Sequence, residues 1–239
     1  MTKGSISKIE TLGLVDGPGI RVVVFLSGCK LRCKYCHNPE MWKLAEPNYT
    51  PEDLVNKILR YKPYFKRNNG GVTFSGGEPL IQHKFLLETC KLLKKENIHI
   101  TLDTSGVGNG NYDEILSYVD LILFDIKHIT KAGYKDLTGY NIDESQTFIE
   151  ALNKSNKPVI IRQVIVPGIM DYDKYLEGLK QELKKINNIV KIEFLPYHDL
   201  ALEKYKMLGI KSPFEPLPVM DKDKCNELYN KFIKELNKD

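Results

Sequence analysis

Short apolar runs, largely of β-branched residues, alternate with longer amphipathic stretches from residue 20 onward, and this alternation limits the possible fold most strongly. The apolar runs cover residues 21–26, 71–74, 98–102, 121–126, 159–166 and 190–195. Stretches with helical spacing of apolar residues cover residues 51–61, 84–96, 112–118, 145–154, 172–186 and 222–236. Strands that alternate with helices pair in parallel through right-handed crossovers. The sequence therefore predicts an α/β fold of six strand–helix units, arranged as an open doubly wound sheet or as a complete or partial barrel.

Polar, Gly-rich or Cys-bearing segments follow the predicted strands. They cover residues 27–38, 75–79, 103–106, 125–127 and 196–199. In both arrangements ligands bind at the carboxyl ends of the strands, so we expect these segments to meet at one rim. Residues 6–19 and the Pro-rich residues 213–218 are expected to be extensions over this rim or over a barrel mouth.

The composition, with 42% hydrophobic and 28% charged residues, is that of an ordinary globular protein. It excludes a disordered tail, a collagen-like fibre and a disulfide-rich secreted scaffold. The net charge of +4 comes from scattered basic residues, so nucleic-acid binding is not expected. Residues 1–10 are polar and the apolar run 22–26 is too short to cross a bilayer, so we expect a cytoplasmic monomer without membrane contact. No shift in composition marks a domain boundary, which favours a single domain.

Three of the five cysteines, Cys29, Cys33 and Cys36, are crowded into one short segment. In a reducing compartment this spacing indicates metal binding rather than disulfides. Three thiolates on one loop can hold an iron–sulfur cluster and leave one iron without a cysteine ligand. The alternative is a structural zinc site whose fourth ligand is His37 or a remote side chain. The other two cysteines are expected to be buried packing residues.

The cysteine spacing, with the aromatic residue Tyr35 before the third cysteine, resembles the signature of the radical SAM superfamily. The resemblance implies a 4Fe-4S cluster whose open iron is chelated by S-adenosylmethionine, which is then cleaved reductively. It also implies a single domain over residues 1–239 with the fold of a partial six-unit α/β barrel. Within it, we expect an extension at residues 1–19, the barrel core at 20–200 and a second extension with a helix at 201–239.

Residues after the second and fourth strands carry chemistry that suits this cofactor. Gly76 and Gly77 let main-chain atoms approach a ligand closely, and with Glu78 they resemble a superfamily motif that contacts the methionine amino group. Asp125 and Lys127 alternate to the same side, so a carboxylate and an ammonium can meet one ligand. By resemblance they would bind the ribose hydroxyls and the methionine carboxylate. The alternative for these two residues is a salt bridge at the rim.

Further cofactor contacts follow from the resemblance. Arg162 is a charged residue inside an apolar strand and must meet either an acid or a ligand. His198 matches a family histidine beside the adenosyl group. The resemblance adds Tyr35, Cys36, His37 and Ile126 to the residues expected to contact the cofactor.

A monovalent cation, Na⁺ or K⁺, is also implied next to the cofactor. The expected ligands are Asp103, Thr104, Asp125 and the main-chain carbonyl of Leu123. Oxygen ligands of this kind suit a hard cation. Alternatively, Asp103 caps the following helix.

Several segments resemble one subgroup of the superfamily, the activases of glycyl radical enzymes, and most closely those that act on pyruvate formate-lyase. The matching residues are 15–21, 33–38, 70–73, 102–104, 162–168 and 195–198. Such activases abstract a hydrogen atom from a glycine Cα of the partner, and Asp16 corresponds to a residue that contacts the partner's loop. Taken alone, residues 16–19 would be a plain turn. Pro79 and Ala201 depart from the subgroup's usual alanine and glycine.

The subgroup implies a flavodoxin or ferredoxin as electron donor. Relatives that act on other glycyl radical enzymes often carry a ferredoxin-like insertion, which this chain lacks, so pyruvate formate-lyase is the favoured partner over a related glycyl radical enzyme. Two alternatives stay open at this stage. One is a radical SAM enzyme for a small molecule, such as a deazapurine synthase. The other is a zinc- or iron-binding interaction protein without catalysis.

Overall fold

A computed structural model describes residues 2–67, 69–108 and 110–238, and a single sheet organises them. The strands are β1 (Ile6–Gly13), β2 (Arg21–Leu26), β3 (Gly71–Gly76), β4 (His99–Thr104), β5 (Leu121–Asp125), β6 (Val159–Ile165) and β7 (Ile189–Pro196). The sheet has the sequential order β1-β2-β3-β4-β5-β6-β7. Strands β2 to β7 pair in parallel, whereas β1 pairs antiparallel with β2.

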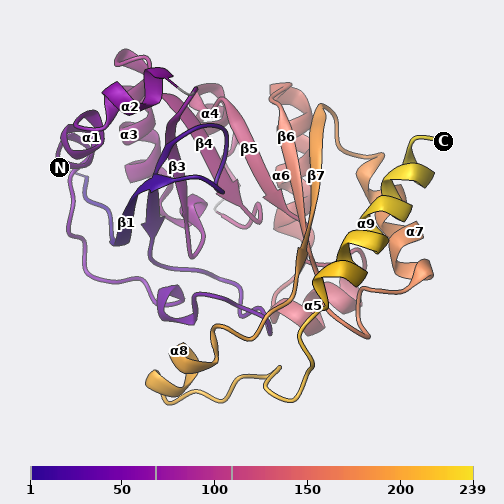
Figure 1. Cartoon of the computed structure of the whole chain (residues 1–239). Coiled ribbons are helices and arrows are strands. Elements are labelled where there is room, and N and C mark those ends of the chain that lie inside the picture. Colours follow the sequence, from indigo (N-terminus) through magenta and orange to yellow (C-terminus); the bar gives the residue numbers. More distant parts are fainter. Residues whose placement is uncertain (1, 68, 109, 239) are drawn as a thin grey trace.

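Helices connect the strands and lie on the outer side of the sheet (Figure 1). The α-helices are α1 (Pro51–Leu59), α2 (Lys62–Arg67), α3 (His83–Lys95), α4 (Asp113–Tyr118), α5 (Lys131–Thr138), α6 (Asp143–Ser155), α7 (Asp173–Leu183), α8 (Leu202–Met207) and α9 (Lys222–Leu236). Two 3-10 helices, η1 (Pro39–Met41) and η2 (Pro79–Gln82), follow the cysteine segment and the paired glycines. No helix in the described part of the chain is both long enough and apolar enough to span a bilayer.

The predicted α/β fold with a parallel sheet is confirmed, because all six predicted strands are present as β2 to β7. The sequential strand order excludes the doubly wound alternative, in which the order reverses. The first and last strands, β1 and β7, are the two ends of the sheet. This arrangement is consistent with a partial barrel.

Residues 6–13 differ from the expected extension, because they form the edge strand β1. The residues of β1 are exposed or half-buried, except for Ile6, which is fully buried. The strand therefore lacks the continuous apolar run that marks a parallel strand covered on both faces, such as β2.

Alternation along the strands separates a core face from a cavity face. In β2, Val22, Val24 and Leu26 point outward into the main core beneath the helices. On β3 and β4 the opposite face carries the buried polar residues Thr73 and Thr101. The sheet thus presents a polar concave face toward the carboxyl ends of its strands.

Candidate active site

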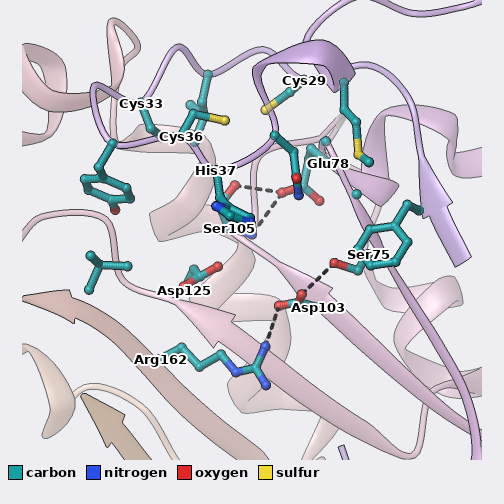
Figure 2. A pocket seen from close by; sticks show the side chains of 18 of the residues that line it. Cys29, Cys33, Cys36, His37, Ser75, Glu78, Asp103, Ser105, Asp125 and Arg162 are labelled. Atoms are coloured by element: carbon teal, nitrogen blue, oxygen red, sulfur yellow. Dashed lines mark hydrogen bonds and ion pairs between the residues drawn. The ribbon is translucent and has the colours of Figure 1, made fainter. Parts of the chain in front are cut away.

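The polar segments after the strands line one cavity of about 680 Å³, as the sequence predicts. Figure 2 shows the three cysteines at one end of this cavity and the acidic side chains of β4 and β5, with Arg162 of β6, at the other. Glu78 and Ser105 lie between the two ends. A volume of this size is within the range of about 300–1,000 Å³ that is usual for small-molecule and cofactor sites.

The cysteine segment is fixed by main-chain hydrogen bonds to two other segments. The amide of Gly28, just after β2, donates to the carbonyl of Met41 at 2.8 Å. This bond holds the residues that follow the cysteines against the end of β2. The amides of Arg32 and Lys34 donate to the last turn of α5, at 2.7 and 2.9 Å. Three residues that were predicted to bind metal are therefore held on a loop with defined geometry.

Burial controls the protonation of the three thiols. It raises the pKa of Cys29 and of Cys33 to about 12, and it also raises the pKa of Cys36. Thiols in this environment keep their protons until a metal competes for the sulfur. Cys90 and Cys225 are buried in the main core on α3 and α9, which confirms them as packing residues.

Glu78 anchors the turn that follows β3. Its carboxylate accepts hydrogen bonds from the Thr104 hydroxyl at 2.6 Å, from the Ser105 amide at 2.9 Å and from the Ser105 hydroxyl at 2.7 Å. The amide of Leu80 donates to it at 3.2 Å. The side chain is only 1% exposed, and burial raises its pKa while these donors oppose the shift. The predicted cofactor residue Glu78 is thus part of a buried network that joins β3 to β4.

The paired glycines before Glu78 lie against the main chain of the cysteine segment. Gly76 has a φ of 120°, and a Cβ at Gly77 would come within 2.3 Å of the Gly28 carbonyl oxygen. The amide of Gly77 donates to the Leu26 carbonyl at 2.8 Å. Only glycine fits at both positions, so the turn and the cysteine segment form one unit.

Asp125 and Lys127 meet at the end of β5, as alternation predicts. The ammonium lies 3.1 Å from the carboxylate and 5.8 Å from the centroid of the Tyr35 ring. Burial lowers the pKa of Lys127, but Asp125 and Tyr35 raise it more, so that the net shift is upward. The amide of Ile126, the residue between Asp125 and Lys127, donates to the Arg162 carbonyl at 3.0 Å. This bond ties the end of β5 to β6.

Arg162 contacts several acids rather than one. Its Nε donates to Glu193 at 3.1 Å, and its Nη1 lies 3.7 Å from Asp103 and 3.9 Å from Asp16. Its Nη2 donates to the carbonyl of Val15 at 2.7 Å. The guanidinium therefore joins β6, β7, β4 and the segment before β2, and it lines the cavity at the same time.

Asp103 accepts a hydrogen bond from Ser75 at 2.7 Å through Oδ2. Its Oδ1 is buried and has no hydrogen-bond partner among the residues that the structure describes. Burial raises the pKa of Asp103 to about 6, against the influence of Arg162, and Asp125 raises it further. Of the other predicted cation ligands, Leu123 is buried beside them on β5, while the Thr104 hydroxyl is already engaged with Glu78.

The comparisons with known proteins agree with this geometry. Residues 23–192 match the model of the radical SAM superfamily, which is more than half of the chain. The chain belongs to the radical SAM superfamily. Its relatives include a pyruvate formate-lyase-activating enzyme from Clostridium pasteurianum, 48% identical over 237 residues that cover 99% of both chains. Another, from Staphylococcus epidermidis, is 43% identical over 96% of this chain and 95% of the relative.

Solved structures support the fold alone. A radical SAM methyltransferase from Sphaerobacter thermophilus matches 99% of this chain and 75% of its own, with a TM-score of 0.64 and 16% identity. A domain of a pyruvate-formate lyase-activating enzyme from Bacteroides vulgatus matches 68% of this chain and 94% of its own, with a TM-score of 0.54 and 21% identity.

The donor set fits the iron–sulfur cluster that the radical SAM superfamily implies. Three thiols line one end of a single cavity. Within residues 2–67, 69–108 and 110–238, no three Cys, His, Asp or Glu side chains lie close enough together to hold one metal ion. A four-iron cluster is larger than one ion and needs its cysteines further apart. The family match therefore favours a cluster over the zinc alternative.

A radical SAM site of this kind includes residues that sequence reasoning missed. The only tryptophan, Trp42, has its indole N–H near the Cys36 thiol, and this N–H opposes the rise in that thiol's pKa caused by burial. Lys204 of α8 donates to the His37 carbonyl, Asn38 and Glu40 at 3.0, 2.7 and 2.7 Å. Helix α8 has six residues and no long apolar repeat, so no local pattern predicts it. For Trp42, the available signal was its closeness to Cys36 in the sequence.

The two predicted histidines lie together at the mouth of the cavity. The rings of His37 and His198 meet edge to face, with centroids 4.9 Å apart. Burial lowers the pKa of His37, and Lys204 and His198 lower it further. Asp16 also lines the cavity, from the segment before β2.

Proposed function

We propose that this chain reductively cleaves S-adenosylmethionine at a 4Fe-4S cluster and removes a hydrogen atom from a glycine Cα of pyruvate formate-lyase. The observation that carries the proposal is the grouping of Cys29, Cys33 and Cys36 at one end of a cavity that also has a carboxylate, an ammonium and an exposed approach. The full-length relatives named pyruvate formate-lyase-activating enzyme support the choice of partner.

The protein's own groups would bind and orient the cofactor. When bound, the cluster and S-adenosylmethionine supply one electron and a carbon radical that takes the glycine hydrogen. The three cysteines would hold the cluster. Main-chain atoms at Gly76 and Gly77 would accept from the methionine amino group, and Lys127 would pair with the methionine carboxylate. Since Lys127 stays charged in its buried position, it can do so without a change of protonation.

The remaining polar groups of the cavity would hold the nucleoside. Asp125 would accept from the ribose hydroxyls, and its contact with Lys127 at 3.1 Å keeps both groups oriented. His198, which lies against His37, would border the adenosyl group at the mouth. The other residues that we assign to the cofactor are Tyr35, Cys36, His37, Glu78, Ile126 and Arg162.

We assign a monovalent cation to the two acids of β4 and β5, beside the Arg162 guanidinium that lies 3.7 Å from Oδ1 of Asp103. The buried Oδ1 of Asp103, which has no hydrogen-bond partner in the described ranges, supports this site. We assign it Asp103, Thr104, Asp125 and the carbonyl of Leu123 as ligands, with Na⁺ or K⁺ as the cation. The cation would offset the negative charge that Asp103 and Asp125 bring together.

The partner's loop would enter beside Asp16. Leu14 and Val15, which precede it, are 73% and 79% exposed, so an apolar surface is available next to the cavity. A loop docked there would exclude water from the reacting atoms. We further propose a monomer in the cytoplasm, with a flavodoxin or ferredoxin as electron donor, since three free thiols suit a reducing compartment.

Anaerobic reconstitution tests the proposal. Protein loaded with iron and sulfide, then reduced and mixed with S-adenosylmethionine and pyruvate formate-lyase, should give 5′-deoxyadenosine and the EPR doublet of a glycyl radical. Cys33→Ala should abolish both products. Cys90→Ala is the matched control, because Cys90 is equally buried but lies in the main core.

Each failure of this experiment has a distinct meaning. Undiminished 5′-deoxyadenosine from Cys33→Ala would overturn the cluster assignment. Cleavage of S-adenosylmethionine without a glycyl radical in pyruvate formate-lyase would overturn the assignment of pyruvate formate-lyase as the partner. Product from a small molecule in the absence of any protein partner would favour the deazapurine-type alternative.

A further inference from the structure

We propose that Tyr134 and Tyr205 are positioning residues that donate their hydroxyl hydrogens to the sulfur atoms of the bound cluster and thereby raise its reduction potential. This inference rests on the proposed function, because it requires that Cys29, Cys33 and Cys36 hold the cluster. The two tyrosines come from α5 and α8, which contact the cysteine segment from separate parts of the chain.

Both hydroxyls are buried without a hydrogen-bond partner in the part of the chain that the structure describes. Tyr134 is 1% exposed and Tyr205 is 2% exposed. A buried hydroxyl that donates to nothing costs free energy, so native proteins keep very few of them. Two such groups beside the same three cysteines indicate that their acceptors arrive with the cluster.

Tyr134 lies directly against the cysteine segment. It forms a small buried cluster with Leu31, Cys33 and Val107, against which Cys29 and Cys36 also pack. Main-chain hydrogen bonds from the cysteine segment to the last turn of α5 hold this helix in place. Burial raises the pKa of Tyr134 above its ordinary value, and Cys33 and Cys29 add to the rise.

Tyr205 lies on α8, beside Trp42. Its ring meets Trp42 edge to face, with centroids 5.8 Å apart, and the indole N–H of Trp42 lowers the pKa of Cys36 against the effect of burial. The preceding residue, Lys204, fixes α8 to the carbonyl of His37. Burial raises the pKa of Tyr205.

Buried tyrosines elsewhere in the protein behave differently. Tyr175 is 1% exposed, like Tyr134, but its hydroxyl donates to Gln163 at 3.3 Å. The hydroxyl of Tyr112 donates to the Gly106 carbonyl at 3.1 Å. The hydroxyl of Tyr35, a third buried one without a partner in the described chain, belongs to a residue already assigned to the cofactor. Unsatisfied tyrosine hydroxyls thus occur beside the cysteines and the cofactor cavity.

Hydrogen bonds to sulfur favour the reduced form of a cluster, since reduction adds one negative charge that the donors stabilise. Removal of either hydroxyl should therefore lower the potential and leave the cluster harder to reduce. The loss of one hydrogen bond of ordinary net strength corresponds to about a fivefold fall in the ratio of reduced to oxidised cluster at a fixed potential.

The test uses Tyr134→Phe, Tyr205→Phe and the double variant. Each is reconstituted anaerobically, checked for iron and sulfide content, and titrated with dithionite and redox mediators while EPR follows the reduced cluster. Each single variant should lower the ratio of reduced to oxidised cluster about fivefold at the wild-type midpoint, and the double variant should lower it further. The melting temperature of each variant before reconstitution should be unchanged or higher, because a buried unsatisfied hydroxyl is removed.

Tyr175→Phe is the matched control. It should lower the melting temperature, because it breaks a hydrogen bond, and leave the potential unchanged. A merely structural role for Tyr134 and Tyr205 would give that same control pattern and would overturn the inference. A wild-type protein that assembles no cluster would overturn the inference together with the proposed function, whereas normal cluster content with unchanged potentials would overturn the inference alone.

Discussion

At the scale of single residues, Glu78 shows how a side chain near a cofactor site can serve the fold. Both of its carboxylate oxygens accept hydrogen bonds, from Thr104, Ser105 and Leu80. The acid therefore holds the turn after β3 against the end of β4. Its resemblance to a cofactor motif indicated a place at the site, and the hydrogen bonds indicate that it fixes the shape of that place.

We predict that Glu78→Gln destabilises the protein by about 1–3 kcal/mol, because a carboxamide nitrogen would face donors that now meet a carboxylate oxygen. Urea unfolding of the protein without cluster measures the change. Glu150→Gln is the control, since Glu150 is exposed. If the two variants unfold at the same urea concentration, the network around Glu78 does not contribute to stability.

At the scale of elements, α8 holds the cysteine segment in place. Lys204 donates to the carbonyl of His37 and the side chain of Asn38 in this segment, and to the side chain of Glu40 in η1, which follows it. In the same helix Lys206 pairs with Glu203, three residues before it, rather than with the cysteine segment as the structure describes it. Because these two lysines of one short helix have different partners, a comparison of their variants measures how much α8 stabilises the cysteine segment.

We predict that Lys204→Ala raises amide hydrogen exchange at Met41 and Trp42 about tenfold, because it removes hydrogen bonds to a charged group. These amides donate within the turn that closes the cysteine segment. Exchange followed by NMR or mass spectrometry on the whole chain gives the measurement. Lys206→Ala should leave the rates unchanged, and equal acceleration by both variants would contradict the assigned role of α8.

Sequence reasoning predicted the elements unevenly, for physical reasons. Strands β2 to β5 are buried along most of their length, and the half-buried β6 and β7 still carry several apolar residues each, so all six were predicted. Helix α5 contains Gly133 and spans eight residues, and β1 alternates exposed polar residues with few apolar ones. Short or exposed elements of this kind are fixed by tertiary contacts, which no local pattern records.

The site follows the same division. The cysteines, the glycine turn and the pair of Asp125 and Lys127 stand next to strand ends, where topology alone brings them together. Tyr134, Tyr205 and Lys204 reach the site from α5 and α8, which were not predicted. Their contributions depend on contacts between segments far apart in the sequence.

At the scale of the whole molecule, one buried guanidinium fixes the segment that carries Asp16. Arg21 is 0% exposed and donates to Thr73 and Thr101 at 3.0 and 2.8 Å, from β2 to β3 and β4. It also donates to the carbonyl of Pro18 at 3.3 Å, and Thr73 donates to the carbonyl of Asp16 at 2.6 Å. The segment before β2 is thereby held inside the concave face of the sheet, opposite the cysteines.

His99 makes this arrangement dependent on pH. Its Nδ1 lies 3.2 Å from Nη1 of Arg21, so the neutral ring can accept a hydrogen bond whereas the protonated ring would face a like charge. Burial and Arg21 lower the pKa of His99 below its ordinary value of 6.5. Below pH 6.5 the unfolded chain then binds a proton that the folded chain does not, so this histidine's contribution to stability is lost as the pH falls.

We predict that the free energy of unfolding of the wild type, minus that of His99→Gln, decreases between pH 7.5 and pH 5.5. The difference isolates His99, because Asp103 and Glu78, whose raised pKa values change stability in the opposite direction over this range, are present in both proteins. Urea unfolding at several pH values provides the measurement. His83→Gln is the comparison for burial alone, and its difference should also decrease on acidification, because burial lowers the pKa of His83. A difference that stays constant or grows on acidification would show that folding does not lower the pKa of His99. The proposed effect of Arg21 on His99 would then be wrong.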